Sequence, residues 1–396
     1  MSGRQALGKG HFQARIGSAT QSPGSFFGVT TSTKTHATAL GLTSSGDAIW
    51  SFRGSISIYD MYSDGTYTWM CGNRTTLWGY PEIATPSNMS VWKLDAQGEI
   101  VWTQDTGGAA FGLTVMSGYV YVAGQANTSW PGAGGVTASM WKLSDIDGSI
   151  SIGKAPTSST GASIIYPRGL CNDGTNIYMA ERTGNWSPVK LNTSCNVVSD
   201  RWAIYGSGSS PADRIVLYSG NTYETTMITS TEAGHGATDR AIGIRKTSTA
   251  GTTAWNYDGG GNYGAIAAPL TSDFWSGIAV DSSGVYACGY DVGGTDQDIV
   301  MLNLSGAEQW DHQHYTGSRT ATRLCGIVHD GSSIWVSGDP SSDWTDTTQY
   351  ASVWKLNDSD RAYTNAIDTQ HSKTVLAKYG NMFNVGGLTA SAGPHA

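Results

Sequence analysis

The candidate nucleophiles in this 396-residue chain include five cysteines, at positions 71, 171, 195, 288 and 325. A catalytic cysteine needs an adjacent base, usually a histidine held by an acid, to keep it as a thiolate. No histidine and acid are paired with any of them in the sequence, and no Cys-x-x-Cys motif occurs. Cys71 and Cys288 occupy a repeated position that alanine or serine fills elsewhere, so we expect both to be buried small residues.

Metal ligands could come from a histidine pair and from two acidic loops. His312 and His314 alternate along one strand and would share a face, but on an outer strand we expect a solvated pair. Calcium could be held by acidic side chains of the two loops, which are Asp291, Asp296 and Asp298, and Asp339, Asp343 and Asp346. Their spacing matches no EF-hand, and aspartate is a common turn former, so we expect turns and no bound cofactor.

The elements that carry these residues repeat along the chain. The phrase Ser-x-Trp-Lys-Leu begins at residues 90, 139 and 352, and weaker copies begin near 37, 188, 241 and 298. A turn with Gly-x-x-x-Trp follows four copies, as in Gly98 and Trp102. Each period of 49 to 57 residues also holds a Gly-bounded strand phrase, such as 118–124, and an apolar phrase around a glycine, such as Gly112. Each period therefore predicts four short strands separated by turns.

A four-stranded unit of about 50 residues is typical of a propeller blade. The chain would begin with the two outer strands of one blade (about 37–52) and end with its two inner strands (about 374–387). Pairing of these halves would close the ring. The prediction is an all-β fold: a seven-bladed β-propeller over 37–387, with an N-terminal arm (1–36) and a C-terminal tail (388–396). The arm is either disordered or ordered on a partner.

The phrases from Gly277 to Gly289 and from Asp298 to Gly306, followed by Trp310, resemble the SBBP-type β-propeller repeat. The rest of 37–387 follows this pattern more loosely. The segment 188–226 departs most, with a displaced Trp202 and the polar run that starts at Tyr223. The resemblance implies a propeller and leaves function open, since such repeats occur in virion, surface and enzyme proteins.

Polar residues at the start of the innermost strands would converge at one mouth of the channel. These candidate binding residues are Arg168, Asp213, Arg214, Trp275 and Arg323, next to Phe111. Arginine forks and aromatic rings could bind a carboxylated ligand or a sugar. In the alternative interpretation, the arginines neutralise nearby carbonyls and aspartates while Trp275 packs between blades.

Composition and charge exclude several classes of protein. Charged residues make up 14% of the chain, the net charge is −8, and glycine accounts for 52 residues. Direct nucleic-acid binding through phosphate neutralisation is therefore not expected. No apolar stretch approaches the roughly 20 residues that span a bilayer, and no secretion signal is recognisable at the N-terminus. The composition resembles that of an extracellular protein, yet the export signal is missing.

These observations predict a non-catalytic binding or structural protein. We expect a virion component of a tailed bacteriophage, in the tail, nozzle, fibre or capsid surface, made in the host cytoplasm. Its partners would be other virion proteins contacted through residues 1–36, a host surface glycan, and copies of itself. The alternative is an exported, extracellular propeller that binds or cleaves carbohydrate. A quinone-dependent dehydrogenase is a more distant alternative, because the metal ligands it needs were not found.

Overall fold

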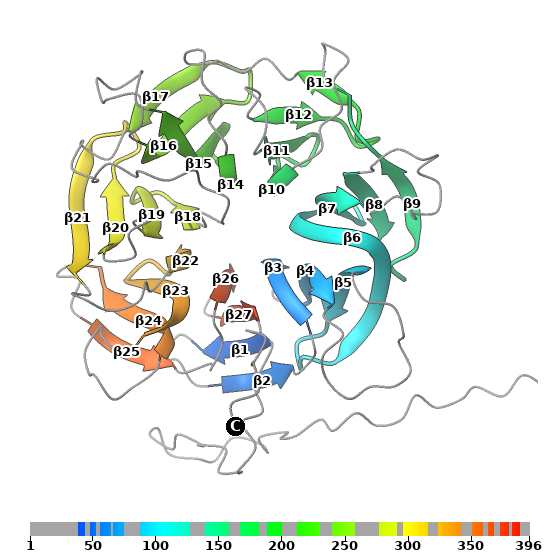
Figure 1. Ribbon diagram of the computed structural model, residues 1–396, viewed down its shortest axis with the longest axis horizontal. Coiled ribbons are helices and arrows are strands. Elements are labelled where there is room, and N and C mark those ends of the chain that lie inside the picture. Colours follow the sequence, from blue (N-terminus) through cyan, green and yellow to red (C-terminus); the bar gives the residue numbers. More distant parts are fainter. Residues whose placement is uncertain are drawn as a thin grey trace, which may run out of the picture.

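The computed structural model is an all-β ring of radially arranged sheets (Figure 1). It describes residues 39–43, 48–52, 56–64, 66–74, 88–126, 139–157, 167–181, 188–199, 212–229, 240–257, 277–290, 296–315, 324–341, 351–358, 363–367, 373–379 and 382–388. The predicted arm (1–36) and the predicted tail beyond Leu388 lie outside these residues. Among the described residues, no helix is long and apolar enough to cross a membrane.

Seven antiparallel blades follow one another around the ring, each with four strands from the channel outwards. Blade I has β3 (Ile56–Ser63), β4 (Thr68–Arg74), β5 (Asn88–Leu94) and the first part of β6 (Ile100–Met116). Blade II has the rest of β6, β7 (Tyr119–Ala126), β8 (Met140–Ser144) and β9 (Ile150–Lys154). Blade III has β10 (Pro167–Asn172), β11 (Ile177–Glu181), β12 (Val189–Leu191) and β13 (Val197–Ser199).

The second half of the ring has the same order of strands. Blade IV has β14 (Ala212–Tyr218), β15 (Asn221–Thr229), β16 (Arg240–Ser248) and β17 (Thr253–Tyr257). Blade V has β18 (Gly277–Val280), β19 (Val285–Tyr290), β20 (Asp296–Leu302) and β21 (Glu308–Tyr315). Blade VI has β22 (Leu324–His329), β23 (Ser333–Ser341), β24 (Ala351–Asn357) and β25 (Tyr363–Ile367). Blade VII has β26 (Lys373–Tyr379), β27 (Met382–Leu388), β1 (Ala39–Thr43) and β2 (Ala48–Phe52).

The two ends of the propeller meet in blade VII. Strand β1 pairs with β27 over five residues, from Ala39 opposite Gly386 to Thr43 opposite Met382. The prediction that the first two and the last two strands form one blade is therefore confirmed, as is the seven-bladed ring. A bridge between Leu388 and Ser57, together with the continuous strand β6, joins blades VII, I and II into one hydrogen-bonded network.

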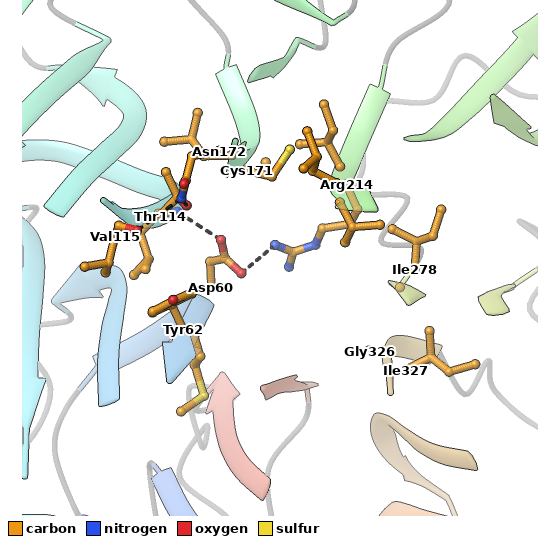
Figure 2. A pocket seen from close by; sticks show the side chains of 18 residues that line it. Asp60, Tyr62, Thr114, Val115, Cys171, Asn172, Arg214, Ile278, Gly326 and Ile327 are labelled. Carbon is orange, nitrogen blue, oxygen red and sulfur yellow. Dashed lines mark hydrogen bonds and ion pairs between the residues drawn. The ribbon is translucent and has the colours of Figure 1, made fainter. Parts of the chain in front are cut away.

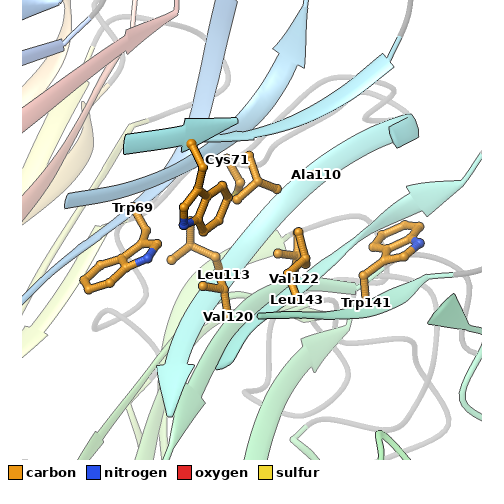
Figure 3. Close-up of a cluster of buried hydrophobic side chains, with 10 residues drawn as sticks. Trp69, Cys71, Ala110, Leu113, Val120, Val122, Trp141 and Leu143 are labelled. Atoms are coloured by element: carbon orange, nitrogen blue, oxygen red, sulfur yellow. The ribbon is translucent and has the colours of Figure 1, made fainter. Parts of the chain in front are cut away.

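Neighbouring blades pack through apolar side chains of their middle strands. Between blades I and II the cluster includes Trp69, Cys71, Val91, Val120 and Val122, all 1% exposed or less (Figure 3). Strands rich in aromatic and β-branched residues suit this arrangement, because the two faces of each sheet are covered by the two neighbouring blades. The hydrophobic core is therefore a series of wedges around the channel rather than one central mass.

The Lys and Trp of the repeated phrases hold blade I to a turn of blade II and blade IV to a turn of blade V. Lys93 Nζ and Trp102 Nε1 both donate to the carbonyl oxygen of Asp145, at 3.0 and 2.9 Å. The same contact recurs three blades further on, where Lys246 and Trp255 donate to the carbonyl of Leu304 at 2.8 and 3.2 Å. This explains why the two residue types recur together: they form one junction between blades.

Blade IV differs from the other blades at its centre. In blade III the inward pair at this register is apolar, Met179 opposite Val189. In blade IV the equivalent register places Glu224 opposite Arg245, and the two form an ion pair of 2.6 Å with side chains 1% and 9% exposed. The polar run beginning at Tyr223, which departed from the repeat, is thus accommodated as a buried strand with its own counter-charge.

Candidate functional site at the central channel

A repeated β-bulge shapes the strand that lines the channel. In β3, Ile58 pairs with Gly72 and Asp60 with Cys71, so the register shifts by one residue at Tyr59. The same irregularity falls at Phe111 in β6 and at Asp213 in β14. A bulge turns the strand locally and redirects its side chains. It therefore changes the direction of the side chains at the start of the channel-lining strand.

The corresponding position is glycine in blades II, III, V and VI. These residues are Gly112, Gly169, Gly277 and Gly326. A Cβ at Gly277 would lie 2.7 Å from the backbone nitrogen of Ile327, and one at Gly112 would collide with the backbone of Arg168. The first strands of neighbouring blades therefore approach each other at backbone distance, and glycine is required there.

Blades I and IV carry charged residues at this glycine position. The pairing of the first strand with the second shows that Asp60, Arg214 and Gly112 occupy equivalent positions. Their partners on the second strand are Cys71, Thr225 and Ala123, respectively. The two charges are opposite in sign. They come from strands that face each other across the ring (Figure 1).

Asp60 and Arg214 meet across the channel. Arg214 Nη1 lies 3.2 Å from Asp60 Oδ1, and Nη2 donates to the carbonyl of Tyr59 at 2.7 Å. The other carboxylate oxygen accepts the backbone N–H of Leu113, in blade II, at 2.9 Å. Figure 2 shows the guanidinium extending from β14 towards the carboxylate on β3. One ion pair thus links blades I, II and IV.

The pair lies in a cavity of about 420 Å³ that is formed by the first strands of blades I to VI. Its walls combine aliphatic side chains and glycines with a few polar groups. Among these residues are Tyr62, Cys171, Asn172, Ile215, Ile278 and Ile327. Asn172 Nδ2 donates to Thr114 Oγ1 at 2.7 Å and so joins blade III to blade II on the same wall. A cavity of this size and composition falls in the range of small-molecule sites.

The electrostatics of Asp60 are governed by burial. Burial raises the pKa of its carboxyl above the ordinary value of 3.8, although the Arg214 charge and the N–H groups of Leu113 and Met61 act in the opposite direction. The unfavourable free energy of removing the carboxylate from water exceeds the favourable interaction of the carboxylate with one guanidinium. Asp60 is therefore more easily neutralised than an exposed aspartate.

At the channel mouth, the bulge residues contact one another. The guanidinium carbon of Arg168 lies 4.0 Å from the ring centroid of Phe111, which meets the ring of Tyr59 edge-on at 5.3 Å. Arg168 and Phe111 are 7% and 9% exposed. A cation over an aromatic face is a stabilising arrangement when it is shielded from water. The rings and the arginine therefore already partner each other.

The described thiols are held in their protonated form. Cys71 and Cys288 are 0% and 3% exposed, which confirms that they are buried small residues. Burial raises the pKa of Cys288 to about 12 and that of Cys195 to about 11. For Cys71 and Cys171 burial also raises the pKa well above 9.0. A thiol that remains protonated is a poor nucleophile.

A second polar cluster lies between blades V and VI, away from the cavity. His329 Nδ1 is 2.6 Å from Asp281 Oδ2, and Nε2 is 3.5 Å from Asp358 Oδ2. The imidazole stacks on the ring of Tyr286 with centroids 4.5 Å apart. Burial works to raise the pKa of Asp281, but the His329 hydrogen bond and charge and the Ser283 and Gly284 N–H groups outweigh it and lower that pKa. This cluster was not predictable from the repeat, because its members lie in different blades.

The structure brings together only part of the predicted binding set. Arg214 lies in the cavity and engages a neighbouring carboxylate and a carbonyl, as the alternative interpretation expected, while Arg168 stacks on Phe111. Asp213 lies on β14, with its side chain outside the described part of the chain, and Trp275 and Arg323 fall outside it altogether. Ligand binding by this set therefore stays a prediction.

The other candidate ligands fall largely outside the described side chains. The backbones of His312 and His314 lie on β21 and those of Asp296 and Asp298 on β20, and Asp339 lies on β23. Asp291, Asp343 and Asp346 fall outside the described residues. Among the side chains that are described, no three from His, Cys, Asp and Glu converge as a metal site would require.

Sequence reasoning missed Asp60, the partner of Arg214. The phrase that marks the channel wall was identified by its glycine, and blades I and IV lack that glycine. An alignment of the first strands on the turn aspartates Asp64, Asp173, Asp281 and Asp330 would have placed Asp60 at the same position. In that alignment, Asp60 would have stood out as a charged residue at a position where the other aligned strands have glycine.

The chain matches no protein-family model and no curated protein sequence. Solved structures do resemble it. A chain of the COPII outer coat vertex on membranes has a TM-score of 0.53 at 10% identity, with 86% of each chain covered. The WD40 β-propeller domain of Doa1 has a TM-score of 0.50 at 10% identity, covering 88% of this chain and 96% of that one. BamB from Moraxella catarrhalis has a TM-score of 0.46 at 14% identity, covering 87% and 89%. At such identities the first two likenesses show the fold alone, and by fold this chain is a β-propeller.

Proposed function

We propose that this protein is a non-catalytic binding and scaffold module, and specifically a structural component of a tailed-bacteriophage virion. The observation that carries the non-catalytic part is the state of Asp60, whose two carboxylate oxygens already engage Arg214 and the N–H of Leu113. A general base or nucleophile has to face its substrate instead. The propeller folds of the solved structures it resembles support a binding or scaffold role.

The thiols support the same proposal. Four described cysteines have raised pKa values, and Cys171, the one that lines the cavity, is among them. Acyl transfer by a protonated thiol would need a base that faces it, and the carboxylate of the cavity wall, Asp60, already engages Arg214 and the Leu113 N–H. The centre of the ring is thus suited to holding blades together rather than to turnover.

The virion assignment is supported by composition. Low charge with abundant glycine, serine, threonine and tryptophan suits a protein that is folded inside a host and later exposed. Residues 1–36 would anchor the propeller to other virion proteins, and one face would present loops to neighbouring subunits or to a host glycan. In this proposal the ring acts as a rigid platform in a homo-oligomeric assembly.

The test is mass spectrometry of density-purified particles from the source culture. Copy number is measured against the major capsid protein. A fixed number that matches a symmetric ring or the capsid lattice is expected. Absence from particles, with the protein free in the medium or on cells, would contradict the virion assignment.

Carbohydrate binding at the channel is the second candidate, favoured by the 420 Å³ cavity close to the Arg168 and Phe111 cluster. A glycan array with the intact protein tests it, alongside Trp275→Ala and Arg323→Ala. Binding that both substitutions abolish at an unchanged melting temperature would favour an exported carbohydrate-binding protein over the virion component.

A further inference from the structure

The glycine position of the channel wall points to a feature beyond the platform role. A lone charge at this position would be buried without a counter-ion, which is strongly destabilising. Here two such charges occur, and they are the two that meet across the ring, at 3.2 Å. The Arg214 and Asp60 side chains are 11% and 20% exposed, and both line the cavity.

We propose that the Asp60–Arg214 pair is a charge-operated gate in the central cavity: while ionised it narrows the cavity and slows the passage of small solutes, and neutralisation of Asp60 widens it. Three structural features support this. The pair spans the space between β3 and β14 (Figure 2). The cavity continues on both strands, along Met61, Tyr62, Ile215 and Val216. The bond to the Leu113 N–H can persist with a neutral side chain, because a carboxylic acid or an amide oxygen still accepts it.

The surroundings of Asp60 make neutralisation compatible with the fold. The groups that face it are the Arg214 guanidinium from β14, the Cys71 thiol from β4 and the Leu113 N–H from β6. Because burial raises the Asp60 pKa, the folded state binds this proton more readily than the unfolded chain does. The contribution of Asp60 to stability therefore increases as the pH falls, so acid releases the bridge without unfolding the blade through this group.

Cys171 provides the reporter, because it lines the same cavity on β10. Its reaction with 4,4′-dithiodipyridine, which proceeds in acid as well as at neutral pH, is followed by peptide mass spectrometry and normalised to the unfolded chain. Cys288, at 3% exposure on β19, reports global opening in the same sample. Asp60→Asn mimics the neutral state. Asp64→Asn makes the same chemical change in the turn of the same blade and is the matched control.

We expect Asp60→Asn to raise the rate at which Cys171 reacts with 4,4′-dithiodipyridine about tenfold or more. The reaction rate of Cys288 in the same variant, and that of Cys171 in the Asp64→Asn protein, should equal the wild-type rates. Lowering the pH of the wild-type protein to about 4 should also raise the reaction rate of Cys171. The double variant Asp60→Gly/Arg214→Gly, which restores glycine at both positions, should be open at every pH.

Three results would overturn the gate. One is an unchanged Cys171 rate in a cooperatively folded Asp60→Asn protein. Another is a wild-type rate at neutral pH equal to that of the double-glycine variant. The third is no rise on acidification, which decides the matter even if Asp60→Asn does not fold.

Discussion

The indole of Trp102 in blade I lies against the turn at Gly148 in blade II. A Cβ at Gly148 would come within 2.6 Å of indole Cε3, and Gly148 has a φ of +71°. The same relationship recurs between Trp255 and Gly306, again at 2.6 Å. The turn glycine of one blade and the tryptophan of the preceding blade are therefore two halves of one contact.

Gly148→Ala should destabilise the protein by about 2–4 kcal/mol, since it combines a left-handed backbone with displacement of Trp102. Gly118→Ala is the control. Gly118 has a φ of +76° but nothing within 4 Å of an added Cβ, so it should lose only about 1 kcal/mol. Urea unfolding of the two variants measures the difference. Equal losses would show that the indole contact adds nothing.

The buried pair of blade IV should be replaceable by the apolar pair of blade III. Glu224→Met/Arg245→Val should be as stable as the wild-type protein or more so, because desolvation offsets most of the attraction between buried charges. Arg245→Val alone should lose about 3–5 kcal/mol, since it leaves Glu224 buried without its counter-charge. Chemical denaturation of both proteins tests this. A double variant less stable than the single variant would contradict it.

Asp281 should contribute to acid sensitivity. Its pKa is lowered in the folded state, so its contribution to stability is present above the ordinary value of 3.8 and is lost as the pH falls through the lowered value. Asp281→Asn should melt at a lower temperature than the wild-type protein at neutral pH. The difference between the two should shrink below about pH 4.

Melting temperatures recorded from neutral pH down to about pH 2 provide the comparison. Asp64→Asn serves as the control, because Asp64 occupies the equivalent turn of blade I and accepts backbone N–H groups of Thr66 and Tyr67, whereas Asp281 also bonds a histidine. If the gap between wild-type and Asp281→Asn proteins stays constant over the whole range, the His329 contact does not stabilise the ionised form.

Ring closure should depend on the last two strands. A chain ending at residue 372 lacks β26 and β27, which leaves β1 without the neighbour that it pairs with over five residues. We expect loss of cooperative thermal unfolding. Addition of a peptide covering residues 373–396 should restore part of it. A truncated protein that melts like the intact one would show that the seam contributes little.

The fold could be predicted because each blade repeats the same pattern of strand and turn residues. Trp102 and its counterparts, the turn glycines and the third-strand lysines recur at intervals of 49 to 57 residues, so seven blades and the seam in blade VII followed from the spacing. The centre of the channel could be predicted only in part. Arg214 was selected by its place before an inner strand, but Asp60 is far away in the sequence and belongs to a blade whose repeat lacks the glycine marker.

The bulges were not predictable from the repeat. Tyr59 and Phe111 look like ordinary members of an apolar strand, and only the cross-strand pairing shows that the register shifts at each of them. The His329 cluster was missed for a similar reason: its aspartates come from a turn of one blade and a turn of another. Contacts between residues of different repeats cannot be predicted from the spacing of the repeats alone.

The cross-channel pair also constrains how this sequence can change over time. Starting from glycine at both positions, an aspartate or an arginine acquired alone would be penalised, and the second substitution would then be strongly favoured. Relatives of this protein should accordingly carry either both charges or neither, and residues 60 and 214 should covary although two whole blades separate them along the chain. A seemingly isolated channel residue is thus half of an inherited unit.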